Sequence, residues 1–199
     1  MTRVIAFIHL SLDGVMQAPG RPDEDRRGGF ERGGWAAPYN DDVMAKAVGE
    51  SMGNTGALLL GRRTYEDFYQ VWPSRTDNPF TPILNNTLKY VASRTLQQPL
   101  PWMNSTLLAG NAEESVAKLR KQQGKDIVIL GSGVLVQSLL RSNLVDELML
   151  TINPLVLGSG RRLFPDGGPC AKLRLVDSKT TSKGVLITTY QPEQGSGST

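Results

Sequence analysis

The chain has 199 residues, of which 39% are hydrophobic and 21% are charged, a balance typical of one globular domain. Its 22 basic and 19 acidic residues leave a net charge of +3, and the basic residues form no stripe with aromatics, which argues against nucleic-acid binding. No apolar stretch approaches the ~18 residues of a membrane span and no signal-peptide pattern is present, so we expect a cytoplasmic protein. With one cysteine, Cys170, and one histidine, His9, an intrachain disulfide is excluded and a metal site is not expected.

The N-terminal part predicts a buried strand and then a long loop. Residues 3–12 form an apolar run typical of a strand buried on both faces, in which His9 is either a hydrogen-bonded core residue or a catalyst. Residues 17–40 are rich in glycine, proline and charge, and such long loops often act as lids or binding loops. Within the loop, Trp35 and Tyr39 are either a stacking surface for a flat ligand or anchors that hold the loop on the core.

Three aspartates are candidate proton donors. Asn40 can cap a helix that runs to about Met52, and Asp41 and Asp42 fall in its first turn, where a carboxylate also interacts favourably with the helix dipole. Asp13 lies in a turn after the first strand, a position that aspartate favours for structural reasons. For each of them, a structural role and a catalytic role remain open.

Three predicted strand ends carry residues suited to bind phosphate. The strands at residues 57–60, 88–92 and 127–130 are followed by Gly-Arg-Arg-Thr, Ser-Arg-Thr and Gly-Ser-Gly, respectively, and helices follow the first and third motifs. Helix N-termini and arginine forks match phosphate oxygens, and ligands of mostly parallel sheets bind at the carboxyl ends of strands. These motifs predict a phosphate-rich cofactor, although tight turns and solvent-facing arginines would also account for them. The serine of the third motif, Ser132, requires ordinary backbone angles.

The remaining pattern completes an α/β fold. We expect a loop over residues 72–86, a strand over 106–109, helices over 113–123 and from 133 to about 143, a strand over 147–152, and a hairpin with strands 173–179 and 185–190. Together these predict a three-layer sandwich around a central mixed, mostly parallel sheet that ends in an antiparallel C-terminal hairpin. We expect one domain over residues 1–192 and a flexible tail over 193–199.

Several segments, taken in order, resemble a known family. They are S-L-D-G-V, L-L-L-G-R-R-T-Y-E-D-F, V-A-S-R-T, I-V-I-L-G-S-G and L-V-D-E-L-M-L-T-I-N-P-L-V-L-G-S-G-R-R-L-F-P. Together they resemble the dihydrofolate-reductase-like fold, and are closer to the reductase domain of the bifunctional riboflavin-biosynthesis deaminase-reductase than to dihydrofolate reductase itself. The resemblance spans residues 3–190 and implies NADPH as cofactor and a homodimer, for which strand residues 148–152 or the terminal hairpin would supply an edge.

The resemblance also implies which residues bind NADPH. The pyrophosphate and adenosine side would contact Gly61, Arg62, Arg63 and Thr64, and the ribose 2′-phosphate would contact Ser93 and Arg94. The glycine turn at the pyrophosphate would be Gly131, Ser132 and Gly133, followed by Val134 and Leu135. The nicotinamide would lie near His9 and Met16.

The function implied by the resemblance is hydride transfer from NADPH to a flat heterocycle with a polarised C=N or C=O bond. This would be a pyrimidine- or pterin-like substrate, of the 5-amino-6-(5-phosphoribosylamino)uracil type, lying against Trp35 or Tyr39. Asp42 would be the proton donor, with Asp41 and Asp13 as alternatives. Two other functions remain open: a non-catalytic NADP-binding sensor or partner-binding module, and a phosphate-binding enzyme without redox chemistry.

Overall fold

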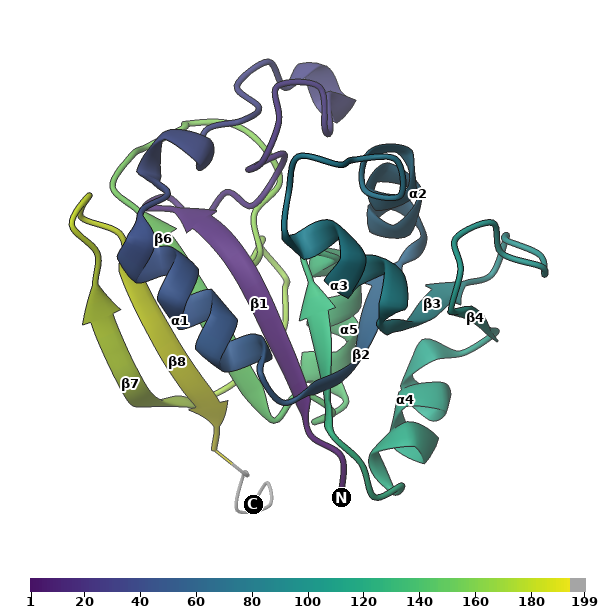
Figure 1. The fold of residues 1–199 in the computed structure, drawn as a ribbon. Coiled ribbons are helices and arrows are strands. Elements are labelled where there is room, and N and C mark those ends of the chain that lie inside the picture. The colour runs from purple at the N-terminus through teal and green to yellow at the C-terminus, as the bar shows by residue number, and fades with distance from the viewer. Residues whose placement is uncertain (194–199) are drawn as a thin grey trace.

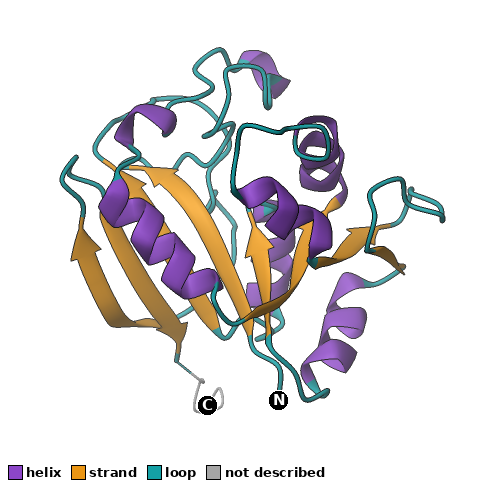
Figure 2. Cartoon of the chain, in the orientation of Figure 1, coloured by secondary structure: helices purple, strands orange, loops and turns teal. Residues whose placement is uncertain are grey.

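An eight-stranded sheet forms the centre of the computed structural model, which describes residues 1–193 (Figures 1 and 2). The strands are β1 (Val4–Ser11), β2 (Thr55–Gly61), β3 (Leu88–Ser93), β4 (Ser105–Ala109), β5 (Asp126–Leu130), β6 (Glu147–Asn153), β7 (Leu173–Thr180) and β8 (Leu186–Pro192). The helices are α1 (Asp42–Met52), α2 (Arg62–Val71), α3 (Phe80–Asn86), α4 (Ala112–Arg120) and α5 (Gly133–Arg141), with short 3₁₀ turns at Arg27–Gly29 and Ala37–Tyr39. Apart from Glu193, the predicted tail lies outside the described residues.

The sheet is mixed, as predicted. Its strand order is β4-β3-β2-β5-β1-β6-β8-β7. The pairs from β4 to β6 are parallel, whereas β8 is antiparallel to both β6 and β7. This confirms the mostly parallel sheet with an antiparallel C-terminal hairpin. Because β6 lies between β1 and β8, residues 148–152 cannot supply a free edge; β7 lies at that end of the sheet.

Successive residues of β1 point to opposite faces of the sheet, and both faces are covered. Val4, Ala6 and Ile8 belong to a core that includes the buried side of α5, whereas Ile5 belongs to a second core with residues of α2 and α3. Figure 1 shows α1 and α3 on one side of the sheet and α5 on the other. The apolar run of β1 is therefore a strand buried on both faces, in a three-layer arrangement.

The helix α3 corrects the prediction of a loop over residues 72–86. The Asn78 side chain accepts a hydrogen bond from the backbone N–H of Phe80 (2.9 Å), and Pro82 stands in the first turn, where its missing N–H is not needed. At the other end, the Lys89 ammonium donates to the carbonyl oxygens of Leu84 (2.7 Å) and Thr87 (2.7 Å). Contacts from residues that flank the helix thus stabilise a segment whose own composition favours a loop.

The start of α1 also differs from the prediction. Asp41, not Asn40, is the N-cap, and its Oδ1 accepts a hydrogen bond from the backbone N–H of Met44 (2.8 Å).

Among the described residues, no helix has the length and apolar character needed to cross a bilayer.

Candidate active site

A large open cavity lies at the carboxyl ends of the parallel strands. Its volume is about 1780 Å³, and it is lined by His9 of β1, Gly61 of β2, Ser93 of β3 and Leu130 of β5. Typical small-molecule sites have volumes of about 300–1,000 Å³, so this cavity has room for more than one ligand. All of the predicted cofactor residues line it: His9, Met16, Gly61, Arg62, Arg63, Thr64, Ser93, Arg94, Gly131, Ser132, Gly133, Val134 and Leu135.

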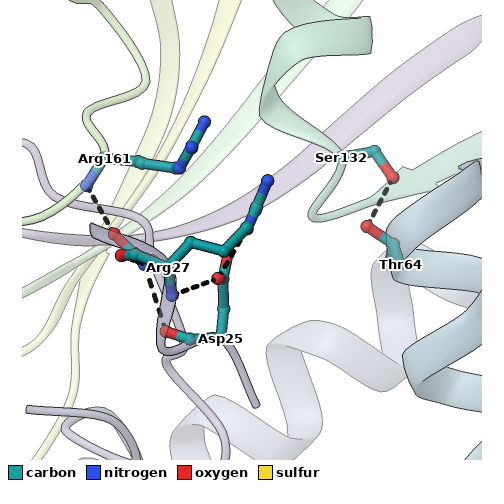
Figure 3. Close-up of polar contacts among 6 residues, drawn as sticks. Asp25, Arg27, Thr64, Ser132 and Arg161 are labelled. Carbon is teal, nitrogen blue, oxygen red and sulfur yellow. Dashed lines mark hydrogen bonds and ion pairs between the residues drawn. The ribbon is translucent and has the colours of Figure 1, made fainter. Parts of the chain in front are cut away.

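The Ser132 hydroxyl joins two of the strand ends. It accepts a hydrogen bond from the backbone N–H of Gly61 (3.0 Å), and its own proton lies between Thr64 Oγ1 (3.0 Å) and the carbonyl oxygen of Leu130 (3.2 Å). Figure 3 shows the contact between Ser132 and Thr64. The turn after β5 is thereby fixed against the turn after β2, and the start of α5 against the start of α2.

The backbone of Ser132 does not have the ordinary angles expected for a serine in this turn. Its φ of 54° and ψ of 42° lie in the left-handed region, where a non-glycine residue is disfavoured by about 1–2 kcal/mol. The expectation was therefore wrong. The hydrogen bonds of the hydroxyl offset this strain, which explains how serine stands in a glycine-rich turn.

The N-terminus of α5 is available to an anion. The Ser132 side chain makes no capping hydrogen bond to the helix, and Gly133, Val134 and Leu135 all line the cavity. A Cβ added at Gly133 would lie 2.1 Å from Met16 Sδ, so the missing side chain of this glycine leaves room for the thioether. The helix dipole, together with the nearby arginines Arg62, Arg63 and Arg94, favours a negatively charged group here.

His9 is a neutral, hydrogen-bonded member of the cavity wall. Its Nδ1 lies 2.7 Å from Thr151 Oγ1, and the edge of its ring contacts Phe7, with ring centroids 5.1 Å apart. Burial lowers the pKa of His9 to about 4, so the imidazole is uncharged near neutral pH. The structure favours the hydrogen-bonded role over that of an acid, although the ring stays in contact with the cavity.

None of the three predicted aspartate donors lines the cavity. Asp41 accepts hydrogen bonds from Ser182 Oγ (2.6 Å) and from the N-terminus of α1, and these bonds lower its pKa to about 2. The backbone N–H of Leu157 and the Ser11 hydroxyl likewise lower the pKa of Asp13 to about 2. A proton donor near neutral pH needs a raised pKa, so both serve structural roles. Asp42 is exposed in the first turn of α1.

Trp35 and Tyr39 are also absent from the cavity wall. Trp35 is 6% exposed, donates its indole N–H to the carbonyl oxygen of Gln17 (2.7 Å), and packs in a small cluster that we call the loop core: Val15, Ala18, Phe30, Trp35, Ala36 and Leu157. Tyr39 is half-buried and packs against the cluster around Met44. Of the two interpretations, the structure favours anchoring of the loop.

Glu24, which is not among the predicted site residues, also lines the cavity. Its Oε2 accepts hydrogen bonds from the backbone N–H groups of Gly20 (2.7 Å) and Arg21 (3.1 Å). Burial nevertheless raises the pKa of Glu24, and Asp67 adds to that effect. An ion pair between Arg21 and Asp67 (2.6 Å) holds this part of the loop on α2. A run of charged loop residues contains no local signal for which carboxyl group becomes buried.

One group of the residues that line the cavity is apolar. Among the described residues, none of those that line the cavity from α1, from α3 or from the C-terminal part of α2 is a lysine or an arginine. We call the part of the cavity that this group lines the apolar compartment; its wall comprises Phe7, Val48, Met52, Phe68, Trp72, Phe80, Ile83, Leu84 and Leu130. Phe68 and Trp72 meet edge to face, with ring centroids 6.3 Å apart. Such a wall suits a flat, uncharged ring.

Comparison with known proteins agrees with this architecture. A family model described as the RibD C-terminal domain matches residues 2–187. Two proteins of Bacillus subtilis (strain 168) are similar in sequence. Uncharacterized protein YyaP is 33% identical over 140 residues, which cover 67% of this chain and 72% of YyaP. Uncharacterized protein YwjB is 30% identical over 132 residues, which cover 65% of this chain and 70% of YwjB.

Solved structures share the fold. A putative riboflavin biosynthesis protein from Shewanella sp. PV-4 has a TM-score of 0.71 and 26% identity, with coverage of 97% of this chain and 100% of that one. Dihydrofolate reductase from Enterococcus faecalis, complexed with NADP(H), has a TM-score of 0.59 and 16% identity, with coverage of 96% and 97%. A deaminase and 5-amino-6-(5-phosphoribosylamino)uracil reductase from Thermotoga maritima has a TM-score of 0.62 and 16% identity, with coverage of 96% and 56%. At these identities, the last two support the fold alone.

Proposed function

The chain belongs to the RibD C-terminal domain family, and on that basis we propose that it is an NADPH-dependent reductase. Its substrate would be a flat pyrimidine- or pterin-like heterocycle with a polarised C=N or C=O bond, related to the uracil derivative for which the Thermotoga neighbour is named. The observation that carries this proposal is the convergence of three strand ends on one cavity, each with groups suited to bind phosphate.

The residues of the cavity fit a dinucleotide. The N-termini of α2 and α5 lack side-chain caps, so their backbone N–H groups are available to the pyrophosphate. Ser93 and Arg94, at the end of β3, would hold the ribose 2′-phosphate, and Met16 and His9 would lie near the nicotinamide. The bound cofactor would supply the hydride. The protein would bind the cofactor and the substrate, orient them relative to each other, and exclude water.

The apolar compartment would hold the substrate ring. It adjoins His9, whose neutral imidazole adds no charge beside a heterocycle. Glu24 replaces the aspartates as the proposed proton donor. It lines the cavity, and burial raises its pKa. The backbone N–H groups of Gly20 and Arg21 both donate to Oε2, and neither donates to Oε1. A carboxylic acid whose pKa is raised toward the working pH is suited to general acid catalysis.

Titration with NADPH and NADH, followed by nicotinamide fluorescence, tests the cofactor assignment. We expect wild type to bind NADPH more tightly than NADH, and Arg94→Ala to remove the preference. One charge-assisted hydrogen bond contributes about 1.5–3 kcal/mol, which corresponds to roughly a 10- to 150-fold loss of affinity. Arg32→Ala is the matched control, because Arg32 is exposed and does not line the cavity. If neither nucleotide binds, the reductase proposal fails.

A second candidate function is a non-catalytic NADP-binding sensor. It is favoured by one observation, namely that all three predicted aspartate donors lie outside the cavity. Pyrimidine and pterin substrates discriminate between the two functions, because a reductase oxidises NADPH in their presence whereas a sensor binds the nucleotide without turnover.

We further propose a homodimer in the cytoplasm. The strand β7 lies at one end of the sheet and exposes Leu175 and Val176, so its free edge and apolar side chains suit a contact with a second copy. Light scattering after gel filtration measures the mass, and a monomer at micromolar concentration would contradict the proposal.

A further inference from the structure

Two arginines from distant parts of the sequence meet at the cavity wall formed by the first loop. Arg27 belongs to the loop after β1 and Arg161 to the loop after β6. The buried Gln17 joins them: its Nε2 donates to the carbonyl oxygens of Asp25 (3.1 Å) and Arg27 (2.9 Å), and its Oε1 accepts from the backbone N–H of Arg161 (2.9 Å). A second contact, from the backbone N–H of Met16 to the carbonyl oxygen of Arg161 (2.9 Å), fixes the same position. The two backbones are thus held together through the buried side chain of Gln17.

The charges of this cluster do not cancel. Arg27 makes a two-point ion pair with Asp25, including a 2.7 Å contact from Nε to Oδ1. Burial raises the pKa of Asp25, but the hydrogen bonds from Arg27 and the charges of Arg27 and Arg161 outweigh it, and the net pKa is lowered. The Arg161 guanidinium therefore lies near the same carboxylate, yet within the described chain it has no hydrogen bond or ion pair with a protein side chain. Because Asp25 is paired with Arg27, the Arg161 guanidinium is left at the cavity wall without a hydrogen-bonded carboxylate.

This positive wall lies across the cavity from the glycine turn. Figure 3 shows Arg27 and Arg161 on one side and Ser132 and Thr64 on the other, and all four residues line the same cavity. A ligand between them would meet the N–H groups of the α5 N-terminus on one side and guanidinium groups on the other. Glu24 and Asp25 are carboxyl groups on the arginine side, so the anion would bind at the guanidinium of Arg161, which has no carboxylate partner of its own.

We propose that Arg161, supported by Arg27, binds a phosphate group in the cavity from the side opposite the Ser132 turn. The planar guanidinium suits phosphate oxygens because it offers two parallel N–H donors. The phosphate belongs either to the pyrophosphate of the dinucleotide or to a substrate that carries a phosphate monoester. The first source rests on the proposed function, whereas the anion site itself does not.

Calorimetric titration of the cofactor-free protein with inorganic pyrophosphate tests the site directly. We expect Arg161→Ala to bind pyrophosphate at least tenfold more weakly than wild type, and Arg161→Lys, which keeps the charge but not the fork, to be intermediate. Arg32→Ala removes the same charge from an exposed position of the first loop that does not line the cavity, so its affinity should equal that of wild type. Because the Arg161 guanidinium supports no described contact, Arg161→Ala should fold as wild type does, which circular dichroism checks.

Two further titrations identify the source of the phosphate. If it is the cofactor, Arg161→Ala weakens NADPH binding at least tenfold, and phenyl phosphate does not bind the NADPH-saturated protein. If it is the substrate, the NADPH affinity is unchanged, and phenyl phosphate binds NADPH-saturated wild type but not NADPH-saturated Arg161→Ala.

The proposal is overturned if wild type and Arg161→Ala are alike toward pyrophosphate, NADPH and phenyl phosphate. Failure of the proposed function gives a different result: wild type would not bind NADPH, while the difference in pyrophosphate affinity between wild type and Arg161→Ala would remain.

Discussion

Replacement of Ser132 by alanine and by glycine separates the two contributions of this residue to stability. Both changes remove the hydroxyl, and with it the acceptor for the Gly61 N–H and the bond to Thr64. Only glycine also relieves the left-handed backbone, which has a φ of 54°. The difference in stability between Ser132→Ala and Ser132→Gly therefore measures the backbone strain alone, because both variants lack the hydrogen bonds of the hydroxyl.

The structure sets the expected sizes. Loss of the hydroxyl leaves a partly buried N–H without its partner, which should lower the free energy of unfolding by about 1–3 kcal/mol in Ser132→Ala. The left-handed conformation disfavours alanine by about 1–2 kcal/mol, and the greater freedom of glycine in the unfolded chain opposes this by about 0.4–1 kcal/mol. Ser132→Gly should therefore be more stable than Ser132→Ala by about 1 kcal/mol.

Urea unfolding followed by circular dichroism gives both free energies, and thermal melts give an independent comparison. A difference of about 1 kcal/mol corresponds to roughly 2–4 °C in Tm for a domain of this size. If Ser132→Ala is as stable as wild type, the hydroxyl does not hold the two turns together. If the alanine and glycine variants have the same urea midpoint, the backbone of Ser132 is not strained.

Three further changes test other parts of the structure. Glu24→Gln keeps an acceptor for the backbone N–H groups of the loop, so NADPH affinity should persist while substrate-dependent NADPH oxidation falls by about 10²–10⁴-fold; unchanged turnover would exclude the acid role. Burial raises the pKa of Asp126, but its hydrogen bonds to Arg3 and Asn54 outweigh burial, and the net pKa is lowered. These contacts therefore stabilise the fold above the unfolded pKa of 3.8, and their contribution is lost as the pH falls below that value. The urea midpoint of Asp126→Asn should fall less than that of wild type between pH 5 and 2.5. Burial lowers the pKa of Lys89 from 10.5 to about 8. Between pH 8 and 10.5 the unfolded chain therefore binds more protons than the folded chain, and the free energy of unfolding should rise with pH. The same rise in a Lys89→Met variant would show that Lys89 is not its cause.

The parts of the fold predicted from sequence are those with strong local patterns. The apolar runs of β1 and β5 are short, branched and buried, and the strand, glycine turn and helix at Gly131 occur within a few residues of one another. The helix α3 was missed because its stability comes from residues outside it, above all the ammonium of Lys89 at its last carbonyls. No periodicity within residues 80–86 encodes that contact.

The same distinction separates the two sides of the candidate site. The predicted cofactor residues follow strand ends, and parallel strands bring their carboxyl ends to one edge, so they line one cavity. Glu24 owes its position to hydrogen bonds within the first loop, and Arg161 owes its position to a contact between two loops. The contact between Gln17 and Arg161 joins residues 144 positions apart, and nothing in either local sequence marks it. The three aspartates lie outside the cavity, and the sequence could not indicate this because a helix cap and a turn use the same residue type as an acid catalyst.

The loop core around Trp35 makes the first loop a replaceable module. Its apolar side chains flank residues 19–29 in the sequence, at Val15 and Ala18 and again at Phe30 and Trp35, so they hold the two ends of that segment on the core. The middle carries the cavity-facing charges of Glu24, Asp25 and Arg27. New residues grafted between positions 19 and 29 should therefore change what the cavity accepts while the sheet keeps its stability, which offers a route to engineering the ligand preference of this domain one loop at a time.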